Sequence, residues 1–209
     1  MKNIIKYLIN SILAGILIGI GGTIFLSLDN KVIGSMLFSI GLFFIVSRKF
    51  NLYTGKVGYI PYNNKKYLIE VFVTIIGNFI GTFFIGTVLR FTRIYSSIHT
   101  KANSLCMIKI NDSILSILIL SFFCGILMFL AVDGYKTIKD SLGKNLSVII
   151  CVMVFILCGF EHSIANMYYF SVNGVLSLKI VGYVLLMILG NGLGGIFIPI
   201  CYKLKKEEI

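Results

Sequence analysis

The chain has 209 residues, of which 57% are hydrophobic and only 13% are charged. Soluble domains of this size carry about a quarter charged residues, so the composition indicates a protein whose solvent is the lipid bilayer. The net charge of +11 would suggest a nucleic-acid partner in a soluble protein, but here the basic residues are spread over six loops without interleaved aromatic residues. We therefore expect no nucleic-acid partner and a single membrane domain over residues 1–209.

Six apolar segments are long enough to cross the hydrocarbon core, which takes roughly 20 residues of helix. They cover residues 7–28, 32–60, 67–90, 112–133, 145–170 and 176–201. The first is longer than the apolar part of a signal peptide, and no small-residue cleavage site follows it, so we interpret it as a span. The sequence thus predicts an all-α membrane protein with six transmembrane helices.

The second and fifth segments are too long for simple spans, and each carries polar residues in its middle. Residues 47–55 interrupt the second segment, and residues 159–163, followed by Asn166, interrupt the fifth. Non-helical backbone at membrane depth is tolerated only where it is buried in protein or lines a cavity. Two such breaks in corresponding places indicate a transport site, so we predict that both helices are broken around one.

The two halves of the chain repeat short sequences at nearly the same offset. Residues 14–17 recur at 124–127, and residues 77–81 recur at 190–194. The centres of the two breaks, Thr54 and His162, are separated by almost the same interval. Each half, about 7–90 and 112–201, holds three spans. Because three is an odd number, the predicted repeat is inverted in the membrane.

Lysine and arginine residues near the ends of the spans favour a cytoplasmic N-terminus. With that orientation the cytoplasmic side collects ten basic residues and the outer side six. Cytoplasmic loops carry the excess of lysine and arginine in membrane proteins. We therefore expect both termini in the cytoplasm.

Glu161 and His162 are ionisable residues in the middle of a predicted span. A carboxylate at the centre of a span costs about 2.5–3.5 kcal/mol on insertion scales, so both residues should face the bundle interior or a pore. We predict that His162 lies at the pore. Glu161 is predicted to be a structural acceptor for freed backbone N–H groups or for a neighbouring subunit. The alternative is a histidine that is merely hydrogen-bonded in the core.

The same residues give little support to an intramembrane enzyme. Glu161-His162 is not part of an HExxH motif, the five cysteines form no CxxC pair, and the sequence has no P-loop. We therefore expect neither catalysis nor a bound metal or cofactor.

Residues 159–168, Gly-Phe-Glu-His-Ser-Ile-Ala-Asn-Met-Tyr, resemble the signature G-F-E-H-x-x-A-N-M of the formate/nitrite transporter family. Residues 52–55, Leu-Tyr-Thr-Gly, resemble the broken second helix of that family, and residues 190–195 resemble its glycine-rich sixth helix. The resemblance extends from residue 10 to residue 200. It implies an aquaporin-like protomer in a homopentamer, with one pore per protomer that passes formate, nitrite or hydrosulfide across the cytoplasmic membrane of a bacterium.

The resemblance also implies roles for individual residues. Thr54 and His162 correspond to a central threonine–histidine pair, Lys109 to a basic residue at the outer mouth, and Asn191 to a pore asparagine of the sixth helix. Asn166 accompanies Glu161 as a structural residue. The apolar constrictions on either side are predicted to contain Leu42, Leu52, Tyr53, Met128, Phe155 and Phe38.

The expected mechanism is passive conduction. Two apolar rings would exclude hydrated ions because a charged anion pays a large desolvation cost there. Lys109 would raise the anion concentration at the outer mouth. His162, oriented by Thr54, would donate a proton or a hydrogen bond, since an imidazole with its ordinary pKa of about 6.5 populates both charge states near neutrality.

Two transport alternatives stay open at the level of sequence. One is a proton-coupled secondary transporter of the same anions that uses His162. The other is an aquaporin-type pore for neutral solutes, which the absence of paired Asn-Pro-Ala motifs from the sequence disfavours.

Overall fold

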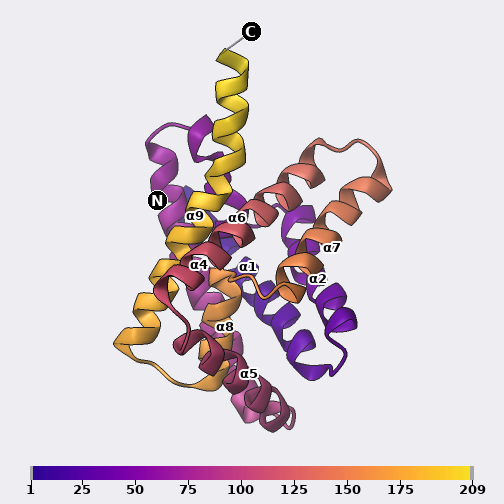
Figure 1. Ribbon diagram of the computed structural model, residues 1–209, viewed down its shortest axis with the longest axis vertical. Helices are drawn as coiled ribbons and strands as arrows, with labels where there is room; N and C mark the ends of the chain where they lie inside the picture. The colour runs from indigo at the N-terminus through magenta and orange to yellow at the C-terminus, as the bar shows by residue number, and fades with distance from the viewer. Residues whose placement is uncertain (1, 208–209) are drawn as a thin grey trace.

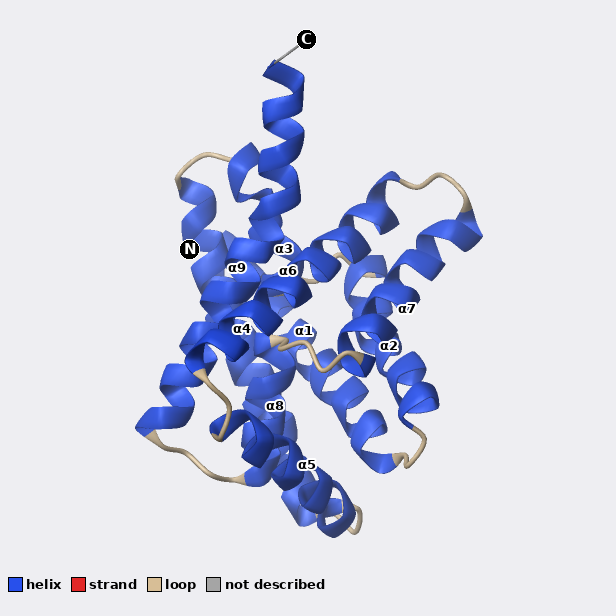
Figure 2. Cartoon of the chain, in the orientation of Figure 1, coloured by secondary structure: helices blue, strands red, loops and turns tan. Residues whose placement is uncertain are grey.

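A computed structural model describes residues 2–207, and helices account for all the regular secondary structure within that range (Figures 1 and 2). The elements are α1 (Lys2–Ser27), α2 (Lys31–Ser47), α3 (Tyr53–Lys56), η1 (Val57–Tyr62), α4 (Lys66–Val88), η2 (Leu89–Phe91), α5 (Tyr95–Ile110), α6 (Ile114–Thr137), α7 (Ser141–Leu157), α8 (Ser163–Asn173) and α9 (Leu178–Glu207). The prediction of an all-α chain is confirmed. In Figure 1 the C-terminus lies at the top and α5 at the bottom.

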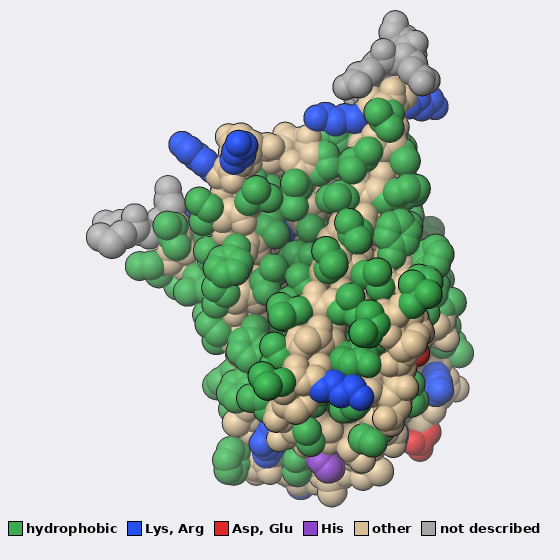
Figure 3. All heavy atoms as spheres, turned by 60° about the vertical axis from the view of Figure 1, so that its left-hand side comes forward, with side chains coloured by type: hydrophobic (Ala, Val, Ile, Leu, Met, Phe, Trp, Pro, Cys, Tyr) green, Lys and Arg blue, Asp and Glu red, His purple; other side chains and the backbone are tan. Residues whose placement is uncertain are grey.

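Four helices of the described range are long and apolar enough to cross a membrane, namely Ile4–Ser27, Lys66–Phe91, Ile114–Thr137 and Leu178–Lys205. Large hydrophobic side chains such as Phe72 and Leu185 are exposed on the outside. Figure 3 shows hydrophobic side chains over the middle of one face and basic side chains gathered toward its two ends. This distribution is that of a multi-pass membrane protein.

Helices α2 and α7 are apolar but shorter, with 17 residues each. Each is followed by a non-helical stretch and then by a second, short helix, α3 after α2 and α8 after α7 (Figure 2). The segments 32–60 and 145–170 therefore each contain more than one helical piece. The main chain turns at Lys49 and Gly159, the residues with positive φ (58° and 70°) that follow α2 and α7.

The close packing of α1 on α4 and of α6 on α9 relies on glycine. A Cβ atom at Gly15 would run into the main-chain carbonyl of Asn78, and one at Gly125 would run into that of Asn191. Small residues at such crossings let two membrane helices approach closely. The approach brings the side chains of Asn78 and Asn191 to the two interruptions.

The polar stretch between the halves, which the sequence analysis left as a connection, forms helix α5. Its buried residues are Ile98, Ala102 and Cys106, and the helix packs against α8. Residues four apart lie on one face of a helix, so these three make a narrow apolar stripe on an otherwise polar segment. The helix carries Lys109 in its last turn.

Candidate functional site

Thr54 and His162 meet at the centre of the molecule, where the two short helices begin. Thr54 lies in α3, and His162 is the N-cap residue of α8. The Thr54 Oγ1 atom is 3.0 Å from His162 Nε2, and both residues are buried, with exposed fractions of 0% and 2%. Two interruptions in opposite halves of the chain thus place a hydroxyl and an imidazole in hydrogen-bonding contact.

The second ring nitrogen of His162 determines which nitrogen carries the proton. His162 Nδ1 accepts a hydrogen bond from the backbone N–H of Ala165, at 3.2 Å. A ring nitrogen that accepts carries no proton, so the neutral imidazole holds its hydrogen on Nε2 and donates it to Thr54 Oγ1. Protonation of Nδ1 would therefore break the hydrogen bond that this nitrogen accepts from the Ala165 N–H.

Asn191 of α9 holds the interruption before α8. Its Oδ1 atom accepts from the backbone N–H of Ser163 at 2.8 Å, and its Nδ2 donates to the carbonyls of Ser121 and Glu161, both at 2.8 Å. The Ser163 N–H lies at the start of α8 and the Glu161 carbonyl in the non-helical stretch before it, whereas the Ser121 carbonyl belongs to α6. A single buried amide therefore ties the start of α8 to α6.

Asn78 of α4 does the same for the interruption before α3. Its Oδ1 accepts from the N–H of Tyr53 at 2.9 Å, and its Nδ2 donates to the carbonyls of Ser11 and Asn51 at 2.7 and 2.9 Å. Asn78 is a residue of this site that we did not predict from the sequence. Its signal was the match to Asn191 within the repeated glycine pattern of residues 77–81 and 190–194.

The matching hydrogen bonds set the register between the halves. The Phe50 N–H donates to the Ile45 carbonyl, and in the second half the Phe160 N–H donates to the Phe155 carbonyl. In this register His162 corresponds to Leu52, so the two break centres taken from the sequence are not equivalent positions of the repeat. Thr54 and His162 instead face each other from opposite halves.

The apolar residues predicted to form constrictions are buried, and several of them lie against the centre. The rings of Phe38 and Phe155 meet edge to face with centroids 5.9 Å apart, and the Phe155 ring lies 5.3 Å from the imidazole of His162. Leu42, Leu52, Met128 and Tyr53 are also buried. Phe155 thus places hydrocarbon directly beside the imidazole, with Phe38 packed behind it.

The Tyr53 hydroxyl is fixed by α9. It donates a hydrogen bond to the carbonyl of Ile188 at 2.7 Å, and a Cβ atom at Gly192 would lie 2.9 Å from it. The extra hydroxyl, compared with a phenylalanine, therefore ties the start of α3 to α9.

Lys109, Glu161 and Asn166 form a polar cluster beside His162. Lys109 Nζ lies 2.8 and 2.7 Å from the two carboxylate oxygens of Glu161, and Asn166 Nδ2 donates to Glu161 at 2.6 Å. The lysine and glutamate side chains are 11% and 5% exposed. Within its own chain Glu161 thus accepts from two side chains, Lys109 and Asn166, which we had not predicted as its donors.

This ion pair also changes the expected role of Lys109. The prediction treated the ammonium as an unpaired charge that collects anions at a pore mouth. A carboxylate at 2.7 Å neutralises most of its field at longer range, so the pair presents a dipole to an approaching anion.

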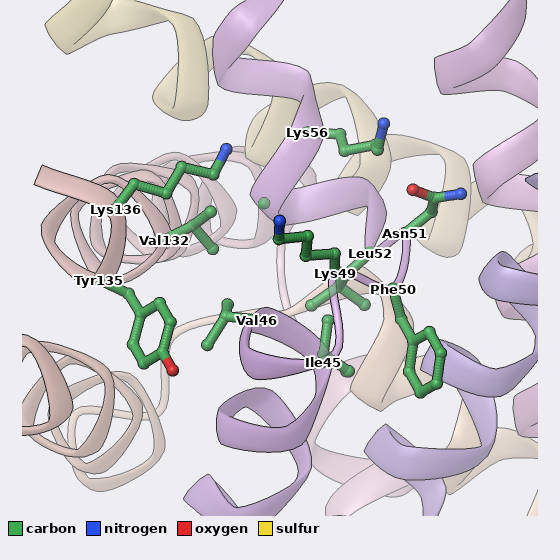
Figure 4. A pocket seen from close by; sticks show the side chains of 11 residues that line it. Ile45, Val46, Lys49, Phe50, Asn51, Leu52, Lys56, Val132, Tyr135 and Lys136 are labelled. Atoms are coloured by element: carbon green, nitrogen blue, oxygen red, sulfur yellow. The ribbon is translucent and has the colours of Figure 1, made fainter.

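Two cavities lie beside this centre, one lined by His162 and the other by Leu52 and Gly55, which neighbour Thr54 in the chain. The smaller, of about 70 Å³, is lined by Lys109, His162 and Asn166, together with Phe25 and Tyr169, which the sequence analysis did not single out. The larger, of about 570 Å³, lies where α2 and α6 end, and we call it the Lys49 pocket (Figure 4). Its lining consists of Ile45, Val46, Lys49, Phe50, Asn51, Leu52, Gly55, Lys56, Val132, Tyr135 and Lys136.

The described residues also bear on metal binding. Within residues 2–207, no three His, Cys, Asp or Glu side chains gather as metal ligands would. Hydrogen-bond donors and hydrocarbon are the chemistry that this centre offers to a small solute.

Comparisons with known proteins agree with this arrangement. The family model for the formate/nitrite transporter matches residues 1–204. A formate-nitrite transporter of Plasmodium falciparum is 25% identical, over 91% of this chain and 74% of the relative. A transporter of Bacillus subtilis that is described as uncharacterized is 26% identical, over 81% of this chain and 73% of the relative.

Solved structures share the fold. A pentameric formate channel with formate bound superimposes with a TM-score of 0.82 at 23% identity, covering 98% of each chain. An ion channel of the same family gives a TM-score of 0.84 at 22% identity, covering 94% of this chain and 88% of the other. The match of the family model over nearly the whole sequence confirms the resemblance in the signature, and the chain belongs to the formate/nitrite transporter family.

Proposed function

We propose that this protein is a channel for small monovalent anions of weak acids, namely formate, nitrite or hydrosulfide, in the cytoplasmic membrane of a bacterium. The observation that carries the proposal is the buried contact between Thr54 Oγ1 and His162 Nε2, with one cavity lined by His162 and another lined by residues next to Thr54. Membership of the family and a fold shared with a formate-bound channel support it. On this reading the protein has no catalytic role and needs no cofactor.

The proposed architecture is a single domain of six spans in two inverted repeats, with an aquaporin-like arrangement in which the second and fifth spans are broken. Its support is the set of main-chain and asparagine hydrogen bonds that recur between the halves. The pentameric state of the formate channel that shares the fold supports a homopentamer with one pathway per protomer. Both termini face the cytoplasm in this arrangement, following the distribution of basic residues.

The proposed path runs from the Lys49 pocket past Leu52 to the Thr54–His162 contact and on into the cavity beside Lys109. An anion between the apolar residues has lost most of its water, so a directed donor stabilises it more than it would in solution. The Nε2–H of His162 is that donor. When an anion arrives, this N–H turns its hydrogen bond from Thr54 Oγ1 to the anion. Asn191 keeps the start of α8, and with it His162, in place.

The tautomer separates two versions of the mechanism. A neutral imidazole with hydrogen on Nε2 donates a hydrogen bond and keeps its proton. Donation of the proton itself requires the doubly protonated ring, in which the Ala165 N–H loses its acceptor on Nδ1. Hydrogen-bond donation therefore costs the structure less, and the anion crosses with its charge partly compensated.

The test is flux into proteoliposomes that are offered formate, nitrite and hydrosulfide in turn over a range of pH, with wild type and His162→Phe in parallel. We expect flux of at least one of these anions in the wild type and its loss in the variant. His99→Phe is the matched control because His99 is the second histidine of the chain and lies on α5, outside the cavity beside His162. That variant should conduct like the wild type.

Other outcomes would replace the proposal. Rapid equilibration of water or glycerol without anion flux would make this a pore for neutral solutes. Accumulation of an anion against its gradient, driven by a pH difference, would make it a proton-coupled transporter. Unchanged flux in His162→Phe would remove the histidine from the pathway.

A further inference from the structure

The Lys49 pocket is larger and more basic than a pathway for a small monovalent anion needs. Its volume of about 570 Å³ falls within the range of sites for small organic molecules, which is roughly 300–1,000 Å³. Three lysines line it, whereas its lining contains no aspartate or glutamate. Formate, nitrite and hydrosulfide would fill a small part of this space and use one of these charges.

The three lysines come from different elements and differ in how they are held. Lys136 of α6 lies over the ring of Tyr59, with its Nζ 3.8 Å from the ring centroid. Lys56 of α3 lies 4.5 Å over Tyr7 and 3.9 Å from a carboxylate oxygen of Glu70. Figure 4 shows Lys49 in the middle of the pocket, with Lys136 and Lys56 on either side of it.

The carboxylates near these lysines are not among the residues that line the pocket. Glu70 is the partner of Lys56, and Asp133 accepts a hydrogen bond from the Tyr59 hydroxyl at 3.1 Å. Within residues 4–205, where side chains are described, Lys49 has no carboxylate within ion-pair distance. The lining of the pocket thus carries three positive charges and no negative one.

Lys49 occupies a backbone position that favours glycine. Its φ of 58° lies in the left-handed region, and its counterpart in the second half is Gly159, with a φ of 70°. A side chain with a Cβ atom is strained there, whereas glycine is not. The turn that ends α2, in which the Phe50 N–H bonds to the Ile45 carbonyl, is served by glycine as well, so the fold does not require the Lys49 ammonium.

We propose that the Lys49 pocket binds a soluble multivalent anion, of the class of a small diphosphate, and that the bound anion blocks conduction. Two adjacent phosphate groups carry several negative charges and can meet ammonium groups from more than one element at once. Leu52 is part of the pocket wall, two residues before Thr54, so an occupant covers the way to the centre. The proposed binding depends on the pocket alone, whereas the proposed block of flux also depends on the proposed function.

Calorimetric titration of the full-length protein in phosphatidylcholine nanodiscs tests the binding, with sodium pyrophosphate as the probe and ionic strength held constant with sodium chloride. We expect saturable binding to the wild type. Lys49→Gly is the variant of choice because glycine relieves the positive φ while it removes the ammonium. It should fold at least as stably as the wild type and bind pyrophosphate roughly tenfold more weakly.

Two further variants complete the titration. Lys136→Gln should also weaken binding, since its ammonium lines the pocket. Lys139→Gln is the matched control because it removes the same charge three residues away, at an exposed position outside the lining. Absence of binding to the wild type, or equal binding by Lys49→Gly, Lys136→Gln and wild type, would overturn the site.

Flux measurements test the block. Pyrophosphate on both sides of phosphatidylcholine vesicles should reduce anion flux through the wild type and through Lys139→Gln, and much less through Lys49→Gly. Flux that pyrophosphate leaves unchanged would overturn the block. A wild type without any anion flux would contradict the proposed function, while the titration would still decide whether the site exists.

A lipid headgroup offers the same phosphate chemistry, and one further arm separates the two sources. Vesicles that contain cardiolipin but no pyrophosphate should conduct as phosphatidylcholine vesicles do. A fall in flux with cardiolipin that Lys49→Gly abolishes would assign the pocket to a lipid and overturn the soluble ligand.

Discussion

Thr54 supplies the hydrogen-bond acceptor for the imidazole of His162. Replacing this threonine with valine removes the hydroxyl with little change in the shape of the side chain. In Thr54→Val the Nε2–H is left buried without a partner, which costs about 1–3 kcal/mol. We expect a lower thermal stability and a weaker dependence of anion flux on His162, measured by comparing Thr54→Val with the double variant that also carries His162→Phe.

Thr82→Val is the control for this change. Thr82 is also fully buried, but its hydroxyl donates to carbonyls of its own helix, α4. Thr82→Val should lower stability. Adding His162→Phe to it should reduce flux by the same factor as adding His162→Phe to the wild type. Equal effects of both threonine variants on that factor would show that Thr54 is structural only.

The pair of Lys109 and Glu161 makes a prediction about stability. Lys109→Met leaves the Glu161 carboxylate, 5% exposed, without its cation, and breaking a buried pair in this way costs about 3–5 kcal/mol. Adding Glu161→Gln should restore most of the loss, because the amide no longer carries the unpaired charge. Thermal unfolding of Lys109→Met, Glu161→Gln, the double variant and the wild type forms the double-mutant cycle.

The exposed pair of Lys101 and Asp29 is the matched comparison. Its side chains are 37% and 100% exposed, and its N–O distance is 2.8 Å. Because water already screens these charges, Lys101→Met should change stability little. A large loss there and a small one in Lys109→Met would contradict the assignment of burial.

The non-helical stretches before α3 and α8 are held by asparagines from other helices, Asn78 of α4 and Asn191 of α9. Asn191→Leu removes the acceptor of the Ser163 N–H and the donor to the carbonyls of Ser121 and Glu161. The Ser163 N–H and the Glu161 carbonyl are then left buried without a partner, at about 1–3 kcal/mol each, so the variant should unfold at a clearly lower temperature and lose flux.

Asn111→Leu serves as the comparison for that prediction. Asn111 is exposed, and its amide bonds only to the carbonyl of Met107 in the turn before it. Thermal unfolding and flux should therefore stay close to wild type. If Asn191→Leu also behaved like the wild type, the interruptions would be held by packing rather than by the amide.

The sequence made the helical segments and their interruptions predictable because polar residues stand out in apolar runs. The structure has non-helical stretches at residues 48–52 and 158–162, which overlap the predicted interruptions at 47–55 and 159–163. Helix α5 was not predictable from the same signal, since its apolar stripe of Ile98, Ala102 and Cys106 is narrow and its remaining residues are mostly polar.

The candidate site was predictable in its residues but less so in its contacts. The family signature pointed to Thr54 and His162, whose side chains the structure brings to 3.0 Å. The ion pair of Lys109 with Glu161 joins residues far apart in the chain and depends on where α5 packs, so no local sequence pattern predicts it. The Lys49 pocket likewise exists only once the ends of α2 and α6 lie together.

For the whole molecule, the outer surface carries aromatic residues such as Phe72, Phe83 and Phe84, each at least half exposed. In a homopentamer part of this surface faces other protomers and the rest faces lipid. We expect native mass spectrometry from lipid nanodiscs to give a pentamer, in keeping with the pentameric channel that shares the fold. A monomer that retains full flux would contradict the proposed assembly.

The asparagine contacts have a consequence for how the chain is made. The amide of Asn78 serves Ser11, Asn51 and Tyr53, and every one of these partners is synthesised before it. Main-chain groups left unpaired in lipid are costly, and domains generally form from the N-terminus as the chain emerges. The segment around α3 can therefore form these main-chain bonds while the second half is still on the ribosome, whereas the hydroxyls of Tyr53 and Thr54 must wait for partners in the second half.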